Sequence, residues 1–81
     1  MRRVIVFSKN NCQWCEKVKD RLREHGVKFL ELNIEENETA ADIAVSQEFK
    51  TMPQVLADGI IIGGHDATVD YLSNRNKDYQ R

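Results

Sequence analysis

The spacing of hydrophobic residues changes along the chain, and each change predicts a different element. Residues 4–7 form a continuous apolar, β-rich run, which is typical of a central strand buried on both faces. Over residues 13–25 the spacing becomes helical, and Gly26 supplies a stop signal. The positions expected on the buried side of this helix are Cys15, Val18, Leu22 and His25. Its solvated side is expected to carry Lys17, Asp20, Arg21 and Glu24. Residues 27–34 then predict a second strand.

The middle of the chain predicts a second helix followed by a hairpin. Residues 36–49 form the helix, with Ile43 in the core and a start resembling a capping box at Thr39 and Asp42. Residues 53–62 contain two β-rich runs joined by an Asp-Gly pair. Because that pair favours a two-residue turn, the two runs are expected to form an antiparallel hairpin.

The end of the chain predicts a short helix and completes the element order. A pair of glycines ends the second hairpin strand, and residues 66–75 predict a helix with Val69 and Leu72 inward. The polar tail, 76–81, is expected to fray. The order is therefore β-α-β-α-β-β-α, an α/β fold class. Its first two strands should be parallel, with a right-handed crossover, and its last two antiparallel. We expect a four-stranded mixed sheet with helices on both faces.

Size and charge limit the classes of function. The 81 residues suit one domain, 1–81, and a net charge of −1 gives no general attraction to nucleic acid or to acidic membranes. No apolar run approaches the roughly 18 residues that a membrane span needs. The apolar run near the start is too short for a signal peptide. We therefore expect a cytoplasmic protein, in which paired thiols are more often catalytic or metal-binding than structural.

The only two cysteines, Cys12 and Cys15, form a Cys-x-x-Cys pair where the first strand gives way to the first helix. Zinc normally takes four ligands, and the remaining histidines, His25 and His65, are far apart in sequence. His25 would lie roughly 15 Å from the pair along the helix, at about 1.5 Å per residue. A structural zinc site and an inert buried pair remain as alternatives. Cys-x-x-Cys beside a strand-helix-strand pattern favours redox chemistry.

The helix start explains how such a pair would react. Unpaired backbone N–H groups and the positive end of the helix dipole favour a thiolate at Cys12, so its pKa should be the lower of the two. Cys15 lies one turn further in and is expected to be more buried, where it can attack a mixed disulfide on Cys12. Lys9 either adds positive charge or is simply solvated. Trp14 is either a core residue or an exposed aromatic platform beside the sulfur.

Three stretches in this order, "KNNCQWC", "TMPQV" and "DGIIIGGHD", resemble the glutaredoxins of the thioredoxin fold, from about residue 4 to residue 72. The likeness is greatest to the small dithiol members of bacteria and bacteriophages. It implies a thiol–disulfide oxidoreductase in which Cys12 is the nucleophile and Cys15 the resolving cysteine. It also implies a cis bond before Pro53, although an ordinary trans proline at a strand start is the alternative. The backbone of Met52 would then bind an extended thiol peptide.

The same resemblance implies a glutathione site. Its residues would be Lys9, Trp14, Thr51, Met52, Pro53, Gly63, Gly64, His65 and Asp66. Gly63 and Gly64 would let backbone N–H groups approach a carboxylate, or they only break the strand. Asp66 would meet the glutathione amine, or it only caps the last helix. His65 is expected to be a solvated loop residue that supplies backbone contacts.

The chain also departs from the family pattern. Many members carry Pro-Tyr between the cysteines where this chain has Gln13-Trp14, and many carry an acid where it has Ala67. The implied partners are glutathione, which acts as a co-substrate, and disulfide-containing or glutathionylated proteins. Ribonucleotide reductase is a candidate protein partner. No tightly bound cofactor or metal is expected. We expect a monomer. Two rivals remain: a redoxin reduced by thioredoxin reductase, and a module that binds an iron–sulfur cluster between two subunits.

Overall fold

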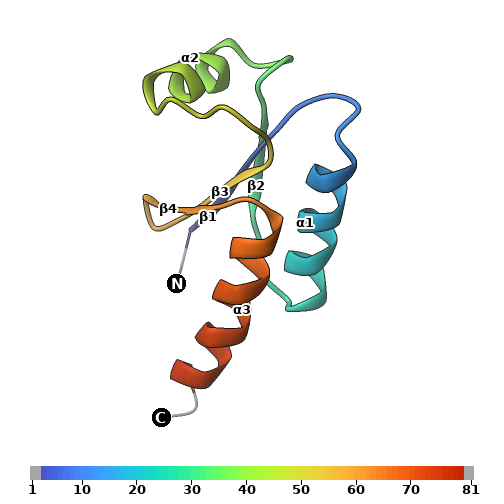
Figure 1. Ribbon diagram of the computed structural model, residues 1–81, viewed down its shortest axis with the longest axis vertical. Coiled ribbons are helices and arrows are strands. Elements are labelled where there is room, and N and C mark those ends of the chain that lie inside the picture. The colour runs from blue at the N-terminus through green and yellow to red at the C-terminus, as the bar shows by residue number, and fades with distance from the viewer. Residues whose placement is uncertain (1–2, 80–81) are drawn as a thin grey trace.

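The computed structural model describes the backbone of residues 3–79 and the side chains of residues 3–74. The element order is the predicted one (Figure 1). The elements are β1 (Val4–Ser8), α1 (Gln13–Glu24), β2 (Leu30–Asn33), α2 (Glu38–Ser46), β3 (Gln54–Ala57), β4 (Ile60–Gly63) and α3 (His65–Tyr79). None of the helices described is long and apolar enough to cross a membrane.

The four strands form one mixed sheet in the order β2-β1-β3-β4. The parallel β1–β2 pair and the antiparallel β3–β4 hairpin confirm the prediction, and an antiparallel β1–β3 pair joins them into one sheet. The hairpin turn is the predicted Asp58-Gly59, with φ angles of 53° and 81°. Two positive φ angles are what a two-residue turn of this kind needs, and glycine adopts them without strain.

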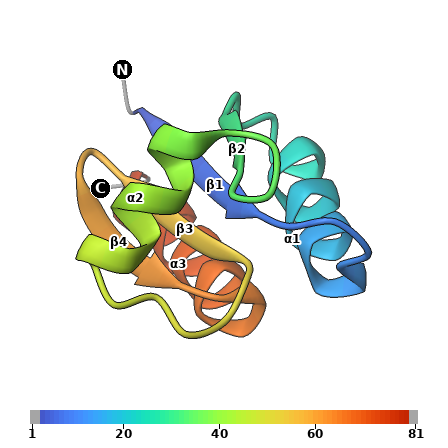
Figure 2. The same ribbon diagram turned by 90° about the horizontal axis from the view of Figure 1, so that it is seen from above.

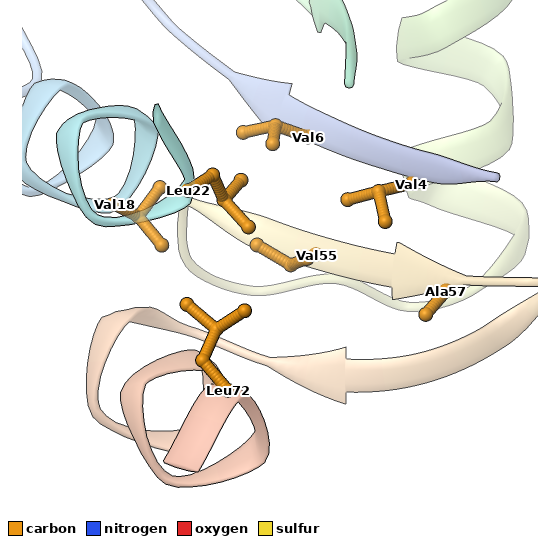
Figure 3. Packing of buried hydrophobic residues seen from close by; sticks show 7 residues of the cluster. All are labelled: Val4, Val6, Val18, Leu22, Val55, Ala57 and Leu72. Atoms are coloured by element: carbon orange, nitrogen blue, oxygen red, sulfur yellow. The ribbon is translucent and has the colours of Figure 1, made fainter. Parts of the chain in front are cut away.

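Helices cover both faces of the sheet, with α1 and α3 on one face and α2 on the other (Figures 1 and 2). The main core lies under α1 and α3, where side chains of β1 and β3 point toward the helices (Figure 3). Its buried members are Val4, Val6, Val18, Leu22, Val55, Ala57 and Leu72. On the other face, Phe7 packs edge-on against Phe49 at 5.4 Å. The first strand is therefore buried on both faces, as predicted.

Several boundaries differ from the sequence-based expectation. β2 is shorter than predicted and lies at a sheet edge, so Leu30 is exposed. His25 ends α1 and is exposed, because the helix stops before it completes another turn on the buried side. The buried side of α1 instead includes Lys19. Residues 15, 18, 19 and 22 follow the spacing of one helix face.

The start of α2 and the length of α3 also correct the prediction. Asn37, rather than Thr39 and Asp42, caps α2, because its Oδ1 accepts a hydrogen bond from the Ala40 N–H at 3.0 Å. Ile43 is only partly buried. α3 continues to Tyr79, so most of the tail expected to fray is helical, and residues 80–81 lie outside the described part. Positions 66–79 contain no glycine or proline, and extending a helix costs far less than starting one.

Candidate active site

The two cysteines stand at the start of α1, joined by a disulfide. Cys12 is the N-cap residue, with extended backbone angles, and its Sγ accepts a hydrogen bond from the Cys15 N–H at 3.1 Å. Cys15 is 1% exposed, whereas Cys12 is partly exposed, as predicted. In the reduced protein the same N–H would point at the Cys12 sulfur and favour its thiolate.

The loop before β3 faces the cysteines. The Met52–Pro53 bond is cis, as predicted, and Pro53 is buried. The Met52 carbonyl oxygen lies 3.9 Å from the Cys12 Sγ. The Gln54 side-chain amide donates to the Thr51 carbonyl at 3.1 Å, which ties this loop to β3. The main chain of residues 51–53 is therefore placed beside the reactive sulfur.

The two glycines shape the junction between β4 and α3. Gly63 has φ of +128°, and a Cβ there would lie 3.1 Å from the Ala67 Cβ, so a side chain would be strained. A Cβ on Gly64 would come within 3.6 Å of the Pro53 carbonyl oxygen. The Gly64 carbonyl accepts hydrogen bonds from both the N–H and the Oγ1 of Thr68, at 3.0 and 2.8 Å. The first turn of α3 therefore begins directly after Gly64, close to the Pro53 backbone, and its leading N–H groups are available to an anion.

These segments enclose one open groove of about 320 Å³. Its lining residues are Trp14, Thr51, Met52, Pro53, Gly64, His65, Asp66 and Ala67. Most of the residues assigned from sequence are thus brought together. Gly63 lies just behind the groove in β4, and Lys9 is an exposed residue of the β1–α1 loop that does not line it.

Trp14 forms the α1 wall of the groove. It is 52% exposed and is therefore the platform expected from sequence rather than a core residue. Its ring lies 5.1 Å from the His65 ring, which joins the first turns of α1 and α3. The Lys17 Nζ lies 4.5 Å from the centre of the Trp14 ring on the same helix. Sequence analysis had left Lys17 among the solvated residues, although its spacing of three from Trp14 is a signal for this contact.

Asp66 and His65 form the α3 wall, and both correct the expectation. His65 is the first residue of α3 rather than a loop residue, and its ring packs on Trp14. Asp66 lies inside the first turn, so it is not the cap of this helix. Its carboxylate is 99% exposed and lies 3.0 Å from the His65 Nδ1. The exposed acid of the groove therefore lies on α3, next to His65, whose ring contacts Trp14.

A charge network around the buried Lys19 ties the other side of α1 to the sheet, and no sequence motif predicted it. The Lys19 Nζ lies 2.8 Å from Glu16 and 2.9 Å from Glu31 of β2. Glu31 also accepts a hydrogen bond from the Ser8 hydroxyl at 2.8 Å. Burial disfavours the charged form of Lys19, but its hydrogen bonds to both carboxylates outweigh this and raise its pKa. The hydrogen bond from Lys19 lowers the pKa of Glu31, against a smaller opposing effect of burial.

Metal ligation has no support among the residues described. In the part of the chain with a defined structure, no group of three or more His, Cys, Asp or Glu residues is placed to hold a metal ion. What the site offers is a partly exposed sulfur at a helix start, a buried partner sulfur, and a groove beside both. This arrangement suits exchange between a dithiol and a disulfide.

Comparison with known proteins identifies relatives of this site and fold. A family model described as Glutaredoxin matches residues 4–62. Glutaredoxin-C2 of Arabidopsis thaliana is 39% identical over 79 residues, which cover 93% of this chain and 68% of the relative. The glutaredoxin-like protein NrdH of Lactococcus lactis subsp. cremoris is 36% identical over 61 residues, which cover 75% of this chain and 85% of the relative.

Solved structures agree on the fold. The NrdH-redoxin of Escherichia coli, described by its thioredoxin-like activity profile, superposes with a TM-score of 0.76 at 24% identity, covering 89% of this chain and 92% of that one. A buckwheat glutaredoxin–glutathione complex superposes with a TM-score of 0.70 at 21% identity, covering 91% of this chain and 78% of that one. At these identities the likeness shows the thioredoxin-like fold.

Proposed function

This chain belongs to the glutaredoxin family and is a thiol–disulfide oxidoreductase with a redox-active Cys12–Cys15 pair, and we propose that glutathione is its reductant. Its substrates in this proposal are protein disulfides and glutathione mixed disulfides. One observation carries the assignment of roles. The partly exposed Cys12 Sγ receives the Cys15 N–H at the helix start, while the Cys15 side chain is 1% exposed.

In the proposed reaction, the Cys12 thiolate attacks one sulfur of the substrate disulfide. A bond forms between the two sulfurs, the substrate S–S bond breaks, and the departing thiolate takes up a proton. Cys15 then loses its proton and attacks the Cys12 sulfur, which releases the reduced substrate and forms the Cys12–Cys15 disulfide. One glutathione thiolate reopens that disulfide at Cys12, and a second releases glutathione disulfide and restores the dithiol.

The groove supports glutathione as the co-substrate. A tripeptide attached to the Cys12 sulfur would pass the Met52 backbone, where it can pair like an added strand. The first-turn N–H groups of α3, behind Gly64, suit one carboxylate, and Asp66 is the groove's exposed acid for the amine. Lys9 would act at longer range, because it lies in the loop outside the groove.

The proposed setting follows from this chemistry. Glutathione acts as a co-substrate, so the reaction needs no tightly bound cofactor, and a monomer contains every group named. A cytoplasmic location fits, because reductants there keep thiols reduced. Deglutathionylation would require Cys12 alone, whereas reduction of protein disulfides by this route requires both cysteines.

A second candidate is a redoxin reduced by thioredoxin reductase, with ribonucleotide reductase as a candidate client. Two observations favour it. Relatives named glutaredoxin-like protein NrdH are 36% identical to this chain. Ala67 also lines the groove where many glutaredoxins carry an acid, so one expected contact to glutathione is missing.

A reductant assay separates the two candidates. Purified protein is given a glutathionylated peptide and, separately, a disulfide-bonded protein, with either glutathione and glutathione reductase or thioredoxin reductase as the reducing system. We expect turnover of both substrates with glutathione, followed as NADPH consumption. Turnover with thioredoxin reductase and none with glutathione would overturn the glutathione proposal in favour of the redoxin.

A further inference from the structure

Lys17 differs from the other basic residues of α1 in having no acidic partner among the side chains described. Lys19 pairs with Glu16 and Glu31, Arg21 with Glu24, and Arg23 with Asp20. Each of these cations is at least partly neutralised by a neighbour. Lys17 instead places its ammonium 4.5 Å from the centre of the ring of Trp14, a residue that lines the groove.

The contact with Trp14 positions the ammonium without neutralising it. The face of an aromatic ring attracts a cation through its quadrupole and carries no formal negative charge. A lysine ammonium has three N–H donors, and no hydrogen bond from Lys17 to a described residue satisfies them. Lys17 therefore brings positive charge and free donors next to Trp14, a residue that lines the groove.

The two helices bring opposite charges to the groove. α1 contributes Trp14 with the Lys17 ammonium over its ring, and α3 contributes the exposed carboxylate of Asp66 beside His65, whose ring lies 5.1 Å from that of Trp14. A substrate attached to the Cys12 sulfur would lie along the groove that Trp14 and Asp66 line. An anionic group on its α1 side would lie near the Lys17 ammonium, whereas the α3 side offers both backbone N–H groups and the negative charge of Asp66.

We propose that Lys17 is a specificity-determining residue that selects thiol substrates bearing a carboxylate close to the reacting sulfur. This inference rests on the proposed function, because it places the substrate disulfide in the Trp14 groove. The carboxylate has two sources, an acidic side chain next to the cysteine of a protein client or a carboxylate of glutathione. Both would meet the same ammonium, so the test treats them in separate arms.

The test uses reduced protein and single-cysteine peptides capped as mixed disulfides with the neutral 2-thiopyridyl group. Attack by Cys12 on the peptide sulfur releases thiopyridone, whose absorbance reports the rate with no glutathione present. The first arm compares two peptides that differ only in Glu or Gln beside the cysteine. The second arm compares capped glutathione with its derivative amidated at the glycine carboxylate.

The variants are Lys17→Gln, Lys17→Arg and the matched control Lys28→Gln. Lys28 is exposed and lies beyond the far end of α1, about 18 Å along the helix at about 1.5 Å per residue, so its replacement removes the same charge away from the groove. We expect wild type to prefer the carboxylate substrate by about three- to tenfold in kcat/KM, mostly through KM. Lys17→Gln should abolish that preference, while Lys17→Arg and Lys28→Gln should retain it.

The outcomes separate this inference from the proposed function. Loss of the preference in the peptide arm supports selection of acidic clients, and loss in the glutathione arm alone supports the same role with glutathione as the source. Wild type that reacts rapidly but equally with charged and neutral substrates would overturn the role of Lys17 and leave the thiol chemistry standing. An equal loss of the carboxylate preference in Lys17→Gln and Lys28→Gln would also overturn the role of Lys17. Wild type that releases no thiopyridone from any substrate would overturn both. Thermal unfolding of each variant confirms that the fold is retained.

Discussion

Lys17 and Lys19 lie two residues apart on α1, yet the structure gives them opposite environments. Lys19 is 6% exposed and is paired with the carboxylates of Glu16 and Glu31. Lys17 is only partly buried and rests on the Trp14 ring beside the groove. A neutralised, buried charge holds elements together, whereas an unneutralised charge at a groove is available to a ligand. α1 therefore has a structural side, which contains Lys19, and a reactive side, which contains Lys17 and faces the groove with Trp14.

The largest expected effects are on the reactive side, at the cysteines. Cys12→Ser should lose all thiol exchange, because a serine hydroxyl cannot form the mixed disulfide. Cys15→Ser should lose reduction of protein disulfides by the dithiol route while keeping deglutathionylation, which needs one sulfur. Both activities are measured with glutathione and glutathione reductase on the two substrate types.

The order of the two thiol pKa values tests the assignment of Cys12 as the nucleophile and Cys15 as the resolving cysteine. The helix-start N–H of Cys15 points at the Cys12 sulfur, so Cys12 should have the lower pKa. Alkylation rates of the two single-cysteine variants across a pH series give both values. A Cys12 pKa at or above that of Cys15, or equal loss of both activities in Cys15→Ser, would contradict the roles proposed.

The next effect is on stability and lies on the structural side. Lys19→Met keeps the aliphatic stem but removes the cation, so Glu16 and Glu31 lose their shared partner. We expect the free energy of unfolding to fall by about 1–2 kcal/mol, less than for a fully buried pair, because both carboxylates reach solvent. Urea denaturation measures it, and turnover per folded molecule should stay near wild type.

A reversal of the stability effects at Lys17 and Lys19 would contradict the different roles given to the two lysines. Lys17→Met is the matched variant, because it makes the same chemical change two residues away. It should lower the unfolding free energy by less than Lys19→Met does, since an exposed cation–π contact contributes only about 0.5–1 kcal/mol. A larger stability loss at Lys17 than at Lys19 would show that the two sides of α1 are wrongly assigned.

Acid stability gives a smaller and more specific test of the network. Lys19 lowers the pKa of Glu31 in the folded state. The pair therefore contributes its full stability above the pKa of Glu31 in the unfolded state, near 4.5. This contribution is lost as the pH falls through the lowered pKa of the folded state. The raised pKa of Lys19 places the corresponding alkaline loss above 10.5. Glu31→Gln should therefore be less stable than wild type at neutral pH and converge with it in acid.

Glu24→Gln is the matched control for that experiment. Glu24 makes an exposed ion pair with Arg21, and exposed pairs contribute little to stability. Unfolding free energies measured from neutral pH down to about pH 3 should show the convergence for Glu31→Gln only. Parallel curves for Glu31→Gln and wild type would mean that Lys19 does not perturb Glu31 in solution.

Local sequence signals predicted the reactive side better than the structural side. The Cys-x-x-Cys pair and the Asp58-Gly59 turn each indicate their conformation within a few residues. The resemblance to glutaredoxins predicted most of the groove residues, whereas the pairing of β1 with β3 was not predicted. The Lys19 network joins α1, β1 and β2, and only the folded sheet brings its members together. Lys19 was not assigned to the buried face of α1 from the sequence, although its spacing from Cys15 and Leu22 is compatible with that face, because a lysine is rarely buried without a partner.

His65 shows the same limit on the α3 side. The glycine pair was predicted to end the strand and the helix was predicted to begin at residue 66, so His65 was expected in a loop between them. In the fold, the helix begins directly after them, since the Thr68 hydroxyl and N–H both satisfy the Gly64 carbonyl. The contact of His65 with Trp14 depends on the docking of α3 beside α1, which no local pattern encodes.

The smallest expected effect concerns the acid on the α3 wall. Asp66→Asn keeps the shape of the side chain and removes its charge, which is fully directed to solvent beside His65. If Asp66 meets the glutathione amine, the apparent KM for glutathione should rise by about two- to tenfold with little change in kcat. Stability should not change measurably, because an exposed surface carboxylate contributes little to it.

Asp70→Asn is the matched control, because Asp70 is also exposed on α3 but does not line the groove. The two variants should differ only in glutathione kinetics. The rate of the Cys12 reaction with an uncharged disulfide should be the same in both, because neither carboxylate touches the reacting sulfurs. Unchanged glutathione kinetics in Asp66→Asn would remove Asp66 from the proposed site.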